Sequence, residues 1–457
     1  GNWNNPATWN LNRVPIANDV VGINPSDVVT FEEVNSVPVQ IKIRSGGTLA
    51  GGFANNWKLN IAGMLVVEAG GTLNVAGQLT ENTNTISFAD VPFGPNDPDQ
   101  YGNGLIVLGQ CFLSGTPRTR KVRLVNEPLI GGTTLQFASP VVGWLVGDKI
   151  LLPETVGVEV TPREMEIVTI LAIAVDNLSC TTTPFQFNHF ASERPGDAVK
   201  EFYPHAGNLT SNVRILSANP IGIRGHIMWT TSANVTSTNV EYFNLGRTRG
   251  DVDISETNKI GRYAAHFHRL SSTADPVRAT FEDNVVHYDP SFTHTRRWGV
   301  TVHDTRKASV KRNLVWNAYG WGIGTEDQPA QNNVFEGNFI IGTTGLGVRE
   351  NTSEGDGIWL SHANNTLKNN VTANNLFRGI EVYRGGSFPD VDQWKGNESY
   401  GEKVGAETWD VNLTDPNGPR SFMDDSVMWA NGDNGYFGYP GYNITFRRMK
   451  VRARRSV

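Results

Sequence analysis

Two of the nine histidines in this chain stand two residues apart in the segment GRYAAHFHRL, residues 261–270. In a β-strand, side chains at positions i and i+2 point to the same face, so His266 and His268 share one face, and Ala265 and Phe267 the other. The apolar pair suits a buried face, which leaves the imidazoles on an outer face. Grouped imidazoles can hold a metal ion, take up a proton or orient a substrate. Which of these they do depends on the residues that the fold places beside them.

A repeat in the second half of the chain predicts that fold. Four segments share a glycine followed by an apolar, a variable, an apolar or small, and a polar residue: WGVTVHDT (298–305), WGIGTEDQ (321–328), DGIWLSHA (356–363) and RGIEVYRG (378–385). Two of the three glycine spacings are near 22 residues, and the third is longer by a loop. Short strands that recur at this period are typical of a solenoid, in which stacked coils bury a shared core.

Two further patterns favour the same architecture. An asparagine recurs between the repeated strands, and this spacing predicts a ladder of stacked side-chain amides at one corner: Asn284, Asn313, Asn338 and Asn370. Near the N-terminus, IRSGGTLAGG (43–52) recurs as VEAGGTLNVAG (67–77), with Gly46 and Gly70 spaced 24 apart.

The patterns together predict an all-β chain, a right-handed parallel β-helix with two additions. We expect an N-terminal glycine-rich capping domain with the first coils at 1–112. A small inserted β-barrel or sandwich is expected at 113–200, where the short-strand rhythm is interrupted. The β-helix that carries the site groove is expected at 201–457.

Composition excludes several classes of protein. The formal net charge of −6 gives no reason to expect nucleic-acid binding, and no apolar run is long enough to span a membrane. Two cysteines are too few for a disulfide scaffold or a cysteine-rich zinc site, and whether Cys111 and Cys180 are bridged stays open, as does the oligomeric state. Export of the protein is expected on separate grounds, which are given below.

The repeat also predicts which side chains converge. The first and third residues after each glycine are nearly all apolar and are expected to face the core, so the second and fourth face outward. Adjacent coils lie ~4.8 Å apart, so outward side chains of neighbouring coils can meet on one ligand. The outward columns are His266, Thr301, Gly324, Trp359 and Glu381; His268, His303, Glu326, Ser361 and Tyr383; and, just past the strands, Arg269, Asp304, Asp327, His362 and Arg384.

One chemistry that suits these columns is metal binding. The candidate ligands are His266, His268, His303 and Glu326. Imidazole and carboxylate together favour zinc or a similar divalent ion. Calcium would prefer oxygen ligands such as Asp304 and Asp327.

The other chemistry is cleavage of a polysaccharide. Hydrolysis needs a carboxyl pair, for which Glu326, Asp327 and Glu381 are the nearest candidates, with His266 and His303 beside them. Elimination needs a base near a uronate carbon, such as His303 or Tyr383, and an arginine to neutralise the uronate carboxylate. The candidate arginines for that role are Arg269, Arg349 and Arg384.

A sugar would also need residues that contact its rings and hydroxyls. Trp359 and Tyr383 offer aromatic faces, and Arg269, His362, Glu381 and Arg384 offer polar partners. Taken singly, each of these residues is equally consistent with an ordinary position on a solvent-exposed face. The clustering of three of nine histidines beside a carboxylate favours a functional site.

These same segments resemble a known family, the cell-surface and secreted hyaluronidases of the transmembrane and cell-migration-inducing type. GRYAAHFH is similar to that family's G-[RY]-Y-P-I-H-F-H stretch, WGVTVHDT to its V-T-V-H strand and GIGTEDQ to its T-E-D segment. The N-terminal GGTL coils resemble its glycine-rich domain, and GWLVGDKILLPET resembles its inserted barrel. Part of the pattern is also similar to fibrocystin-like proteins.

The resemblance implies that His266, His268, His303, Glu326 and Asp327 belong to a central groove. It implies an extracellular or cell-surface protein acting on an acidic, glycosaminoglycan-like polysaccharide such as hyaluronan, and it keeps calcium among the possible cofactors. Ala264 and Ala265 replace the family's Pro-Ile pair and Gln328 its glycine, which puts the substrate in question more than the fold. Hydrolysis is the expected reaction; a polysaccharide lyase and a non-catalytic carbohydrate-binding or adhesion module are the alternatives.

Overall fold

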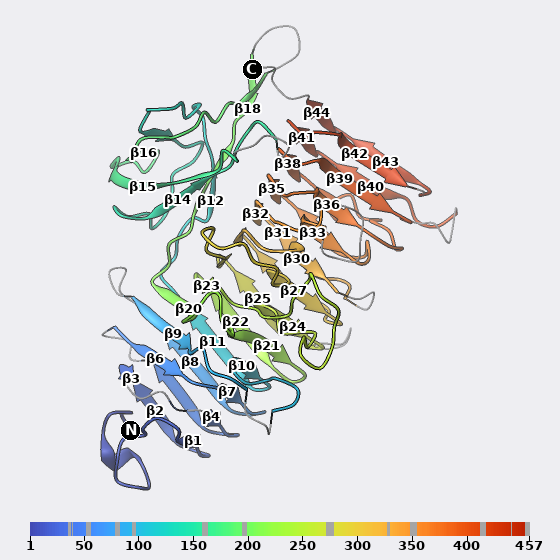
Figure 1. The fold of residues 1–457 in the computed structure, drawn as a ribbon. Helices are drawn as coiled ribbons and strands as arrows, with labels where there is room; N and C mark the ends of the chain where they lie inside the picture. The colour runs from blue at the N-terminus through green and yellow to red at the C-terminus, as the bar shows by residue number, and fades with distance from the viewer. Residues whose placement is uncertain are drawn as a thin grey trace. The chain divides into compact units, whose positions relative to one another are not determined.

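The computed structural model describes residues 1–34, 38, 40–51, 56–77, 83–93, 97–157, 163–193, 199–270, 278–326, 330–347, 354–411, 417–439 and 441–452. Within these ranges the chain is built from β-strands, and the only helical element is the short 3-10 turn η1 (Pro6–Thr8). The strands form three parallel sheets of twelve strands each and two smaller antiparallel sheets (Figure 1). The chain passes through the three large sheets in turn, which makes the fold the predicted parallel β-helix.

The strands of the first sheet carry the candidate site. In spatial order they are β1 (Val20–Ile23), β4 (Gln40–Ile43), β7 (Met64–Val67), β10 (Gly104–Val107), β21 (His226–Thr230), β24 (Ala265–His268), β27 (Val300–His303), β30 (Trp321–Thr325), β33 (Asp356–Leu360), β36 (Arg378–Val382), β39 (Val404–Trp409) and β42 (Asn434–Tyr439).

The second and third sheets complete each coil. The second contains β2 (Val28–Phe31), β5 (Thr48–Gly51), β8 (Thr72–Ala76), β11 (Gln110–Ser114), β22 (Asn234–Thr238), β25 (Ala279–Glu282), β28 (Ser309–Lys311), β31 (Val334–Glu336), β34 (Thr366–Lys368), β37 (Trp394–Lys395), β40 (Ser421–Asp424) and β43 (Ile444–Arg447). The third contains β3 (Glu33–Val34), β6 (Lys58–Ile61), β9 (Asn84–Phe88), β20 (Val213–Ser217), β23 (Glu241–Phe243), β26 (Val285–His287), β29 (Leu314–Trp316), β32 (Phe339–Ile341), β35 (Val371–Ala373), β38 (Glu398–Tyr400), β41 (Val427–Trp429) and β44 (Lys450–Arg452).

The glycine-rich N-terminal segment forms the first coils of this same solenoid. Its strands alternate between buried and more exposed positions, as expected where one face lines a core. Gly46 and Gly70, the glycines of the short repeat, have φ angles of +80° and +83°. These values lie in the left-handed region, which glycine adopts without steric cost, so the repeated glycines mark repeated corners.

An antiparallel sheet interrupts the solenoid between β11 and β20. Its strands, in spatial order, are β12 (Lys121–Arg123), β19 (His205–Asn208), β14 (Lys149–Leu152), β15 (Glu166–Ile173), β16 (Ser179–Thr182) and β13 (Thr134–Gln136). A bridge between Leu124 and Phe137 joins the two edges, so the sheet closes into a small barrel around an apolar core. A separate hairpin pairs β17 (Ser192–Glu193) with β18 (Lys200–Phe202). An inserted β-barrel or sandwich was predicted at 113–200, and the strands of the observed barrel run from Lys121 to Asn208.

The predicted asparagine ladder is present at Asn313, Asn338 and Asn370 and continues to Asn397, while the Asn284 amide bonds Ser237 and the backbone of Val240. The side-chain amide of Asn313 donates to that of Asn338, Asn338 donates to Asn370, and Asn370 donates to Asn397, each at 3.0 Å. All four residues are fully buried. Because each amide both donates and accepts, the ladder satisfies polar groups that burial would otherwise leave without partners.

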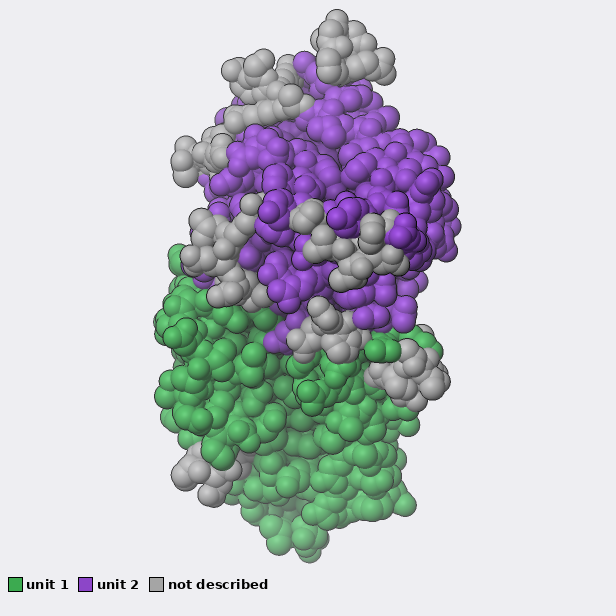
Figure 2. Space-filling view, turned by 90° about the vertical axis from the view of Figure 1, so that its right-hand side faces the viewer, with its two compact units in different colours: residues 1–116, 211–309 green, residues 117–210, 310–457 purple. Residues whose placement is uncertain are grey.

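The chain divides into two compact units, each formed by two separate segments (Figure 2). Unit 1 comprises residues 1–116 and 211–309, and unit 2 comprises residues 117–210 and 310–457. No helix among the described residues is long and apolar enough to cross a membrane. Cys111 and Cys180 are free, buried thiols.

Candidate active site on the first sheet

The three predicted histidines converge on the outer face of strands β24 and β27. These strands pair in parallel with His268 opposite His303, and Val300 and Val302 face the core without exposure. The ring centroid of His303 lies 4.8 Å from that of His268 and 5.7 Å from that of His266, and the His266 and His268 centroids are 5.3 Å apart. The predicted register is therefore confirmed for these strands.

His266 is held as a neutral imidazole with a defined tautomer. Its Nδ1 lies 2.9 Å from the carbonyl oxygen of Gly261, which can only accept, so Nδ1 carries the proton. Nε2 consequently presents its lone pair, the form that binds a metal or accepts a proton. Burial is the main reason that the pKa of His266 lies well below its usual value, and the neighbouring histidines lower it further.

His268 is more accessible than His266 but is also neutral at physiological pH. Its Nδ1 lies 3.0 Å from the hydroxyl of Thr230 on β21. Partial burial and then the charge of His303 lower the pKa of His268 to about 4. A neutral imidazole at pH 7 can act as a base or a ligand, whereas it cannot donate a proton as an imidazolium would.

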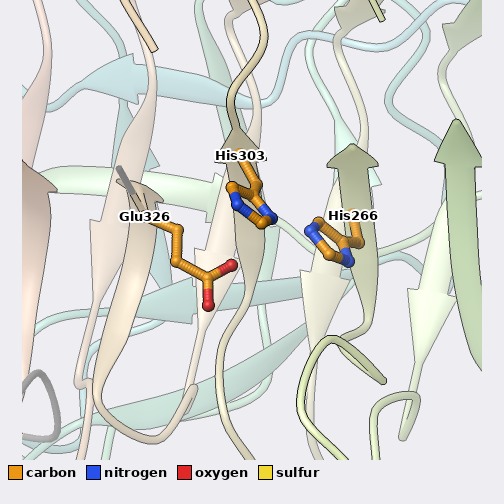
Figure 3. A group of neighbouring side chains, drawn as sticks. All are labelled: His266, His303 and Glu326. Atoms are coloured by element: carbon orange, nitrogen blue, oxygen red, sulfur yellow. The ribbon is translucent and has the colours of Figure 1, made fainter. Parts of the chain in front are cut away.

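A carboxylate accompanies the histidines. Donor atoms of His266, His303 and Glu326 all lie within 4.8 Å of one another, and Figure 3 shows the Glu326 carboxylate beside the two rings. The His266 and His303 planes are inclined by only 4°. Two imidazoles and a carboxylate form a donor set suited to zinc or a similar ion. Asp327 and Arg349, which the sequence also nominates, lie outside the described residues.

Arg269 and Asp304 directly follow the two histidine strands and pair with each other. The Arg269 Nε lies 3.4 Å from the Asp304 carboxylate, and both side chains are exposed. An exposed ion pair contributes little to stability, so both groups can exchange partners at small cost. Arg269 thus keeps an accessible position next to the histidines, as a substrate-binding role would need.

The prediction that the whole outward face is wet is wrong. His266, Trp359 and Glu381 are 1%, 5% and 1% exposed, although their backbone register points them away from the core. In unit 1 the reason is a long connection between β23 and β24, whose Gly261 and Tyr263 pack on the His266 ring. Sequence alignment of strands reveals the register but not which connections fold back over the outer face.

The predicted aromatic positions in unit 2 form a stack instead of two free platforms. The rings of Trp321 and Trp359 lie parallel with centroids 4.8 Å apart, and Tyr383 follows at 5.8 Å. The Trp321 ring occupies the place of a side chain at Gly324, where an added Cβ would lie 2.8 Å from it. Trp359 is therefore a packing residue, and Tyr383, which is 40% exposed, is the ring that a sugar could reach.

Arg384 lies beside the exposed Tyr383 ring, and the His362 ring lies next to the backbone of Gly385 and Gly386. The Arg384 guanidinium sits 5.3 Å from the Tyr383 ring centroid, a cation–π arrangement. His362 Nδ1 accepts a hydrogen bond of 3.2 Å from the backbone of Asn364, so its Nε2 carries the proton and can donate. An exposed aromatic ring with a guanidinium beside it has the composition of a contact for an anionic sugar.

A buried acidic cluster next to this stack was not predicted as a unit. Arg378 binds Asp356 through Nε at 2.8 Å, Glu381 through Nη1 at 2.5 Å and Glu354 through Nη2 at 3.3 Å. Glu381 therefore does not point to solvent, which contradicts its predicted role in contacting substrate. The signal was present in the repeat, because Asp356 and Arg378 precede equivalent glycines in neighbouring coils, and opposite charges in one column indicate an ion pair.

Part of the chain matches a described protein family. Residues 222–384 match the family described as CEMIP beta-helix, a range that contains every described site residue named above as a sequence prediction. Among curated proteins, human fibrocystin-L is 21% identical over 86% of this chain, and the match covers 10% of fibrocystin-L. The human cell migration-inducing and hyaluronan-binding protein is 23% identical over 49% of this chain, covering 17% of that protein. The chain thus spans a small part of these relatives.

Similarity to solved structures is remote. The tailspike gp61 of Pseudomonas phage phi297 covers 86% of this chain and 66% of its own length at 12% identity, with a TM-score of 0.25. A mutant of the periplasmic alginate epimerase AlgG covers 97% and 87%, at 10% identity and a TM-score of 0.28. The β-helix assignment is therefore based on the strand order of this chain and not on similarity to these solved structures. The match of residues 222–384 to the CEMIP beta-helix family model agrees with the resemblance seen in the sequence.

Proposed function

We propose that the protein acts outside the cell on an extended acidic polysaccharide and hydrolyses its glycosidic bonds. The observation that carries the proposal is the convergence of His266, His268 and His303 on one outer face, with the Glu326 carboxylate within ligand distance of two of them. The name of the human hyaluronan-binding relative makes hyaluronan the first polysaccharide to test.

The roles proposed for these residues follow from their protonation. His268 is neutral because its pKa is lowered to about 4, so it suits the base that activates water. A carboxyl group is proposed as the acid that protonates the leaving oxygen: Glu326 or Asp327 in the metal-free site, and Asp327 when Glu326 coordinates a metal ion. Arg269 is exposed beside the histidines and can release Asp304 to pair with a uronate carboxylate.

We also propose that His266, His303 and Glu326 hold a divalent metal ion of the zinc type. The proton on His266 Nδ1 is fixed by Gly261, which leaves Nε2 in the form that coordinates a metal. An ion bound there would act as a Lewis acid on a substrate oxygen or on water.

Tyr383, Arg384 and His362 are proposed to bind the sugar chain. Tyr383 exposes an aromatic face, Arg384 lies beside it, and the His362 Nε2 proton can donate to a hydroxyl or carboxylate. These contacts would position a polysaccharide without taking part in bond cleavage.

Elimination is the second candidate, and one observation favours it. Neutral histidines and an exposed tyrosine are bases suited to removing a proton from a uronate, and Arg269 and Arg384 can each pair with its carboxylate. A carbohydrate-binding module without catalysis is the third candidate, because proteins can share a fold without sharing a catalytic activity.

Digestion of a panel of uronic-acid polysaccharides separates the three. The proposal expects shorter chains with new reducing ends and no unsaturated uronate in the ultraviolet spectrum. Unsaturated products would show that the reaction is elimination and not hydrolysis. Intact polysaccharide that nevertheless binds the protein would leave only the binding module.

A further inference from the structure

The buried acidic cluster of unit 2 has more negative charge than its partners neutralise. Glu354, Asp356 and Glu381 are 7%, 0% and 1% exposed. Within the described part of the chain, Arg378 is the only cation that pairs with these three carboxylates. Glu407 adds a fourth buried carboxylate, with an oxygen 3.7 Å from the same guanidinium. Uncompensated carboxylates are costly to bury, so the cluster requires protons or a further cation.

Two carboxylate oxygens in the cluster have no hydrogen-bond partner. They are Oε2 of Glu381 and Oε2 of Glu354, and both are buried. Arg378 uses the other oxygen of each residue, Oε1. When Glu381 is ionised, the lone pairs of its buried Oε2 have no donor among the described residues. Coordination to a cation would satisfy these lone pairs.

The spacing of the oxygens suits a hard divalent cation. One oxygen from each of Glu354, Asp356 and Glu381 lies within 4.8 Å of the other two. Two oxygens on opposite sides of a calcium ion are separated by roughly 4.6–5.2 Å, since Ca–O distances are about 2.3–2.6 Å. The donor set contains only oxygens, which excludes a preference for zinc. Magnesium would retain several waters, and these buried side chains leave little access for them.

We propose that Glu354, Asp356 and Glu381 form a calcium-binding site in the wall of the β-helix, with Arg378 as its internal counter-charge. The site is separate in residues and ligand chemistry from the histidine group. It would tie β33 to β36 and the connection before β33, in the same unit as the exposed Tyr383. The expected consequence is that calcium stabilises this part of the solenoid.

Calcium titration of the whole protein tests the proposal. After treatment with EGTA and desalting, isothermal titration with calcium chloride is expected to show a saturable site, and the melting temperature is expected to rise with calcium. Glu381→Gln keeps the size of the side chain but removes its charge, and it should weaken calcium binding by at least tenfold. Glu336→Gln is the matched control, because Glu336 lies on the second sheet and pairs with Lys311.

A second readout locates the ion. Terbium occupies calcium sites and emits when an excited tryptophan lies close to it. Trp359 stands opposite Glu381 on the neighbouring strand, so bound terbium should emit on tryptophan excitation, and Trp359→Phe should reduce that emission without abolishing calcium binding. Glu354→Gln provides a second ligand variant if Glu381→Gln fails to fold.

The outcomes are distinct from those of the proposed function. His303→Ala should leave calcium binding unchanged, whatever it does to polysaccharide cleavage. The calcium site is overturned if the EGTA-treated protein binds no calcium and melts at the same temperature with and without it. It is equally overturned if calcium binds with unchanged affinity to both Glu381→Gln and Glu354→Gln.

Discussion

His268 and His303 stand opposite each other on the parallel strands β24 and β27, with ring centroids 4.8 Å apart and planes inclined by 67°. Each ring projects from a different coil, so the stacking of coils is what creates the pair. A cluster made in this way keeps its spacing only as long as the β-ladder keeps its register. The geometry of the histidine cluster and the stability of the solenoid are therefore linked in this protein.

The metal proposal predicts a loss of bound ion in a double mutant. Wild-type protein purified without chelator is expected to carry a zinc-type ion, measured by elemental analysis, and His266→Ala/His303→Ala should lose it because two of three ligands are gone. His294→Ala, at a partly exposed histidine of unit 1, is the control and should retain the ion. A metal-free wild type with full activity would contradict the prediction.

Substitutions of Tyr383 separate binding from chemistry. Tyr383→Ala removes the exposed ring and should raise KM roughly tenfold, equivalent to about 1.4 kcal/mol of binding, with little change in kcat. Tyr383→Phe keeps the ring and should behave as wild type if hydrolysis is correct. If the tyrosine is instead the base of an elimination, Tyr383→Phe will reduce kcat severely, and this result would refute hydrolysis.

The asparagine ladder predicts a large stability effect far from the site. Asn338 accepts from the backbone and side chain of Asn313 and donates to Val310 and Asn370. Asn338→Ala leaves these buried groups unpaired and should cost about 3 kcal/mol, seen as a fall of several degrees in melting temperature. Asn434→Ala, at an exposed position, should change it little. Equal melting temperatures for the two variants would exclude a stabilising role for the ladder.

Buried histidines predict loss of stability in acid. Burial, and then the charges of Arg123 and Lys121, hold the pKa of His205 well below 6.5, so the folded protein keeps this ring neutral while the unfolded chain protonates it. His205 therefore contributes full stability above pH 6.5, and this stability is lost as the pH falls below 6.5 towards the folded pKa, by up to about 1.4 kcal/mol per pH unit.

Denaturant melts at pH 7.5 and 5.5 measure this effect. His205→Gln cannot be protonated, so it should be less stable than wild type at pH 7.5 but lose less stability between the two pH values. His294→Gln serves as the control and should show the wild-type pH dependence. A steeper loss in His205→Gln than in wild type would reverse the predicted sign.

The solenoid could be predicted from the sequence because the period of its coils appears in short-range sequence patterns. Repeated glycines, apolar positions and asparagines each occupy equivalent places in successive coils, and strand register follows from them. Val300, Val302, Ile358 and Ile380 were predicted to face the core, and all are fully buried. The column of His268 and His303 follows from the same register.

What the sequence could not provide is the arrangement of the connections. Whether an outward side chain meets water depends on loops that return over the sheet, and Gly261 and Tyr263 cover His266 in this way. Glu381 and Trp359 were predicted as outward contacts but are buried by the Arg378 ion pairs and by the Trp321 stack. The alternation of apolar and polar residues along a strand does not show whether a connection covers its outer face.

Turnover by a single-residue variant tests the central claim most directly. His303→Gln keeps a polar side chain of similar length but removes the imidazole from the centre of the cluster. With the most active uronic-acid polysaccharide as substrate, kcat is expected to fall by roughly 100-fold or more, while polysaccharide binding is retained, and His294→Gln should keep wild-type turnover. A His303→Gln variant that cleaves the polysaccharide as fast as wild type would contradict the assignment of the histidine cluster as the active site.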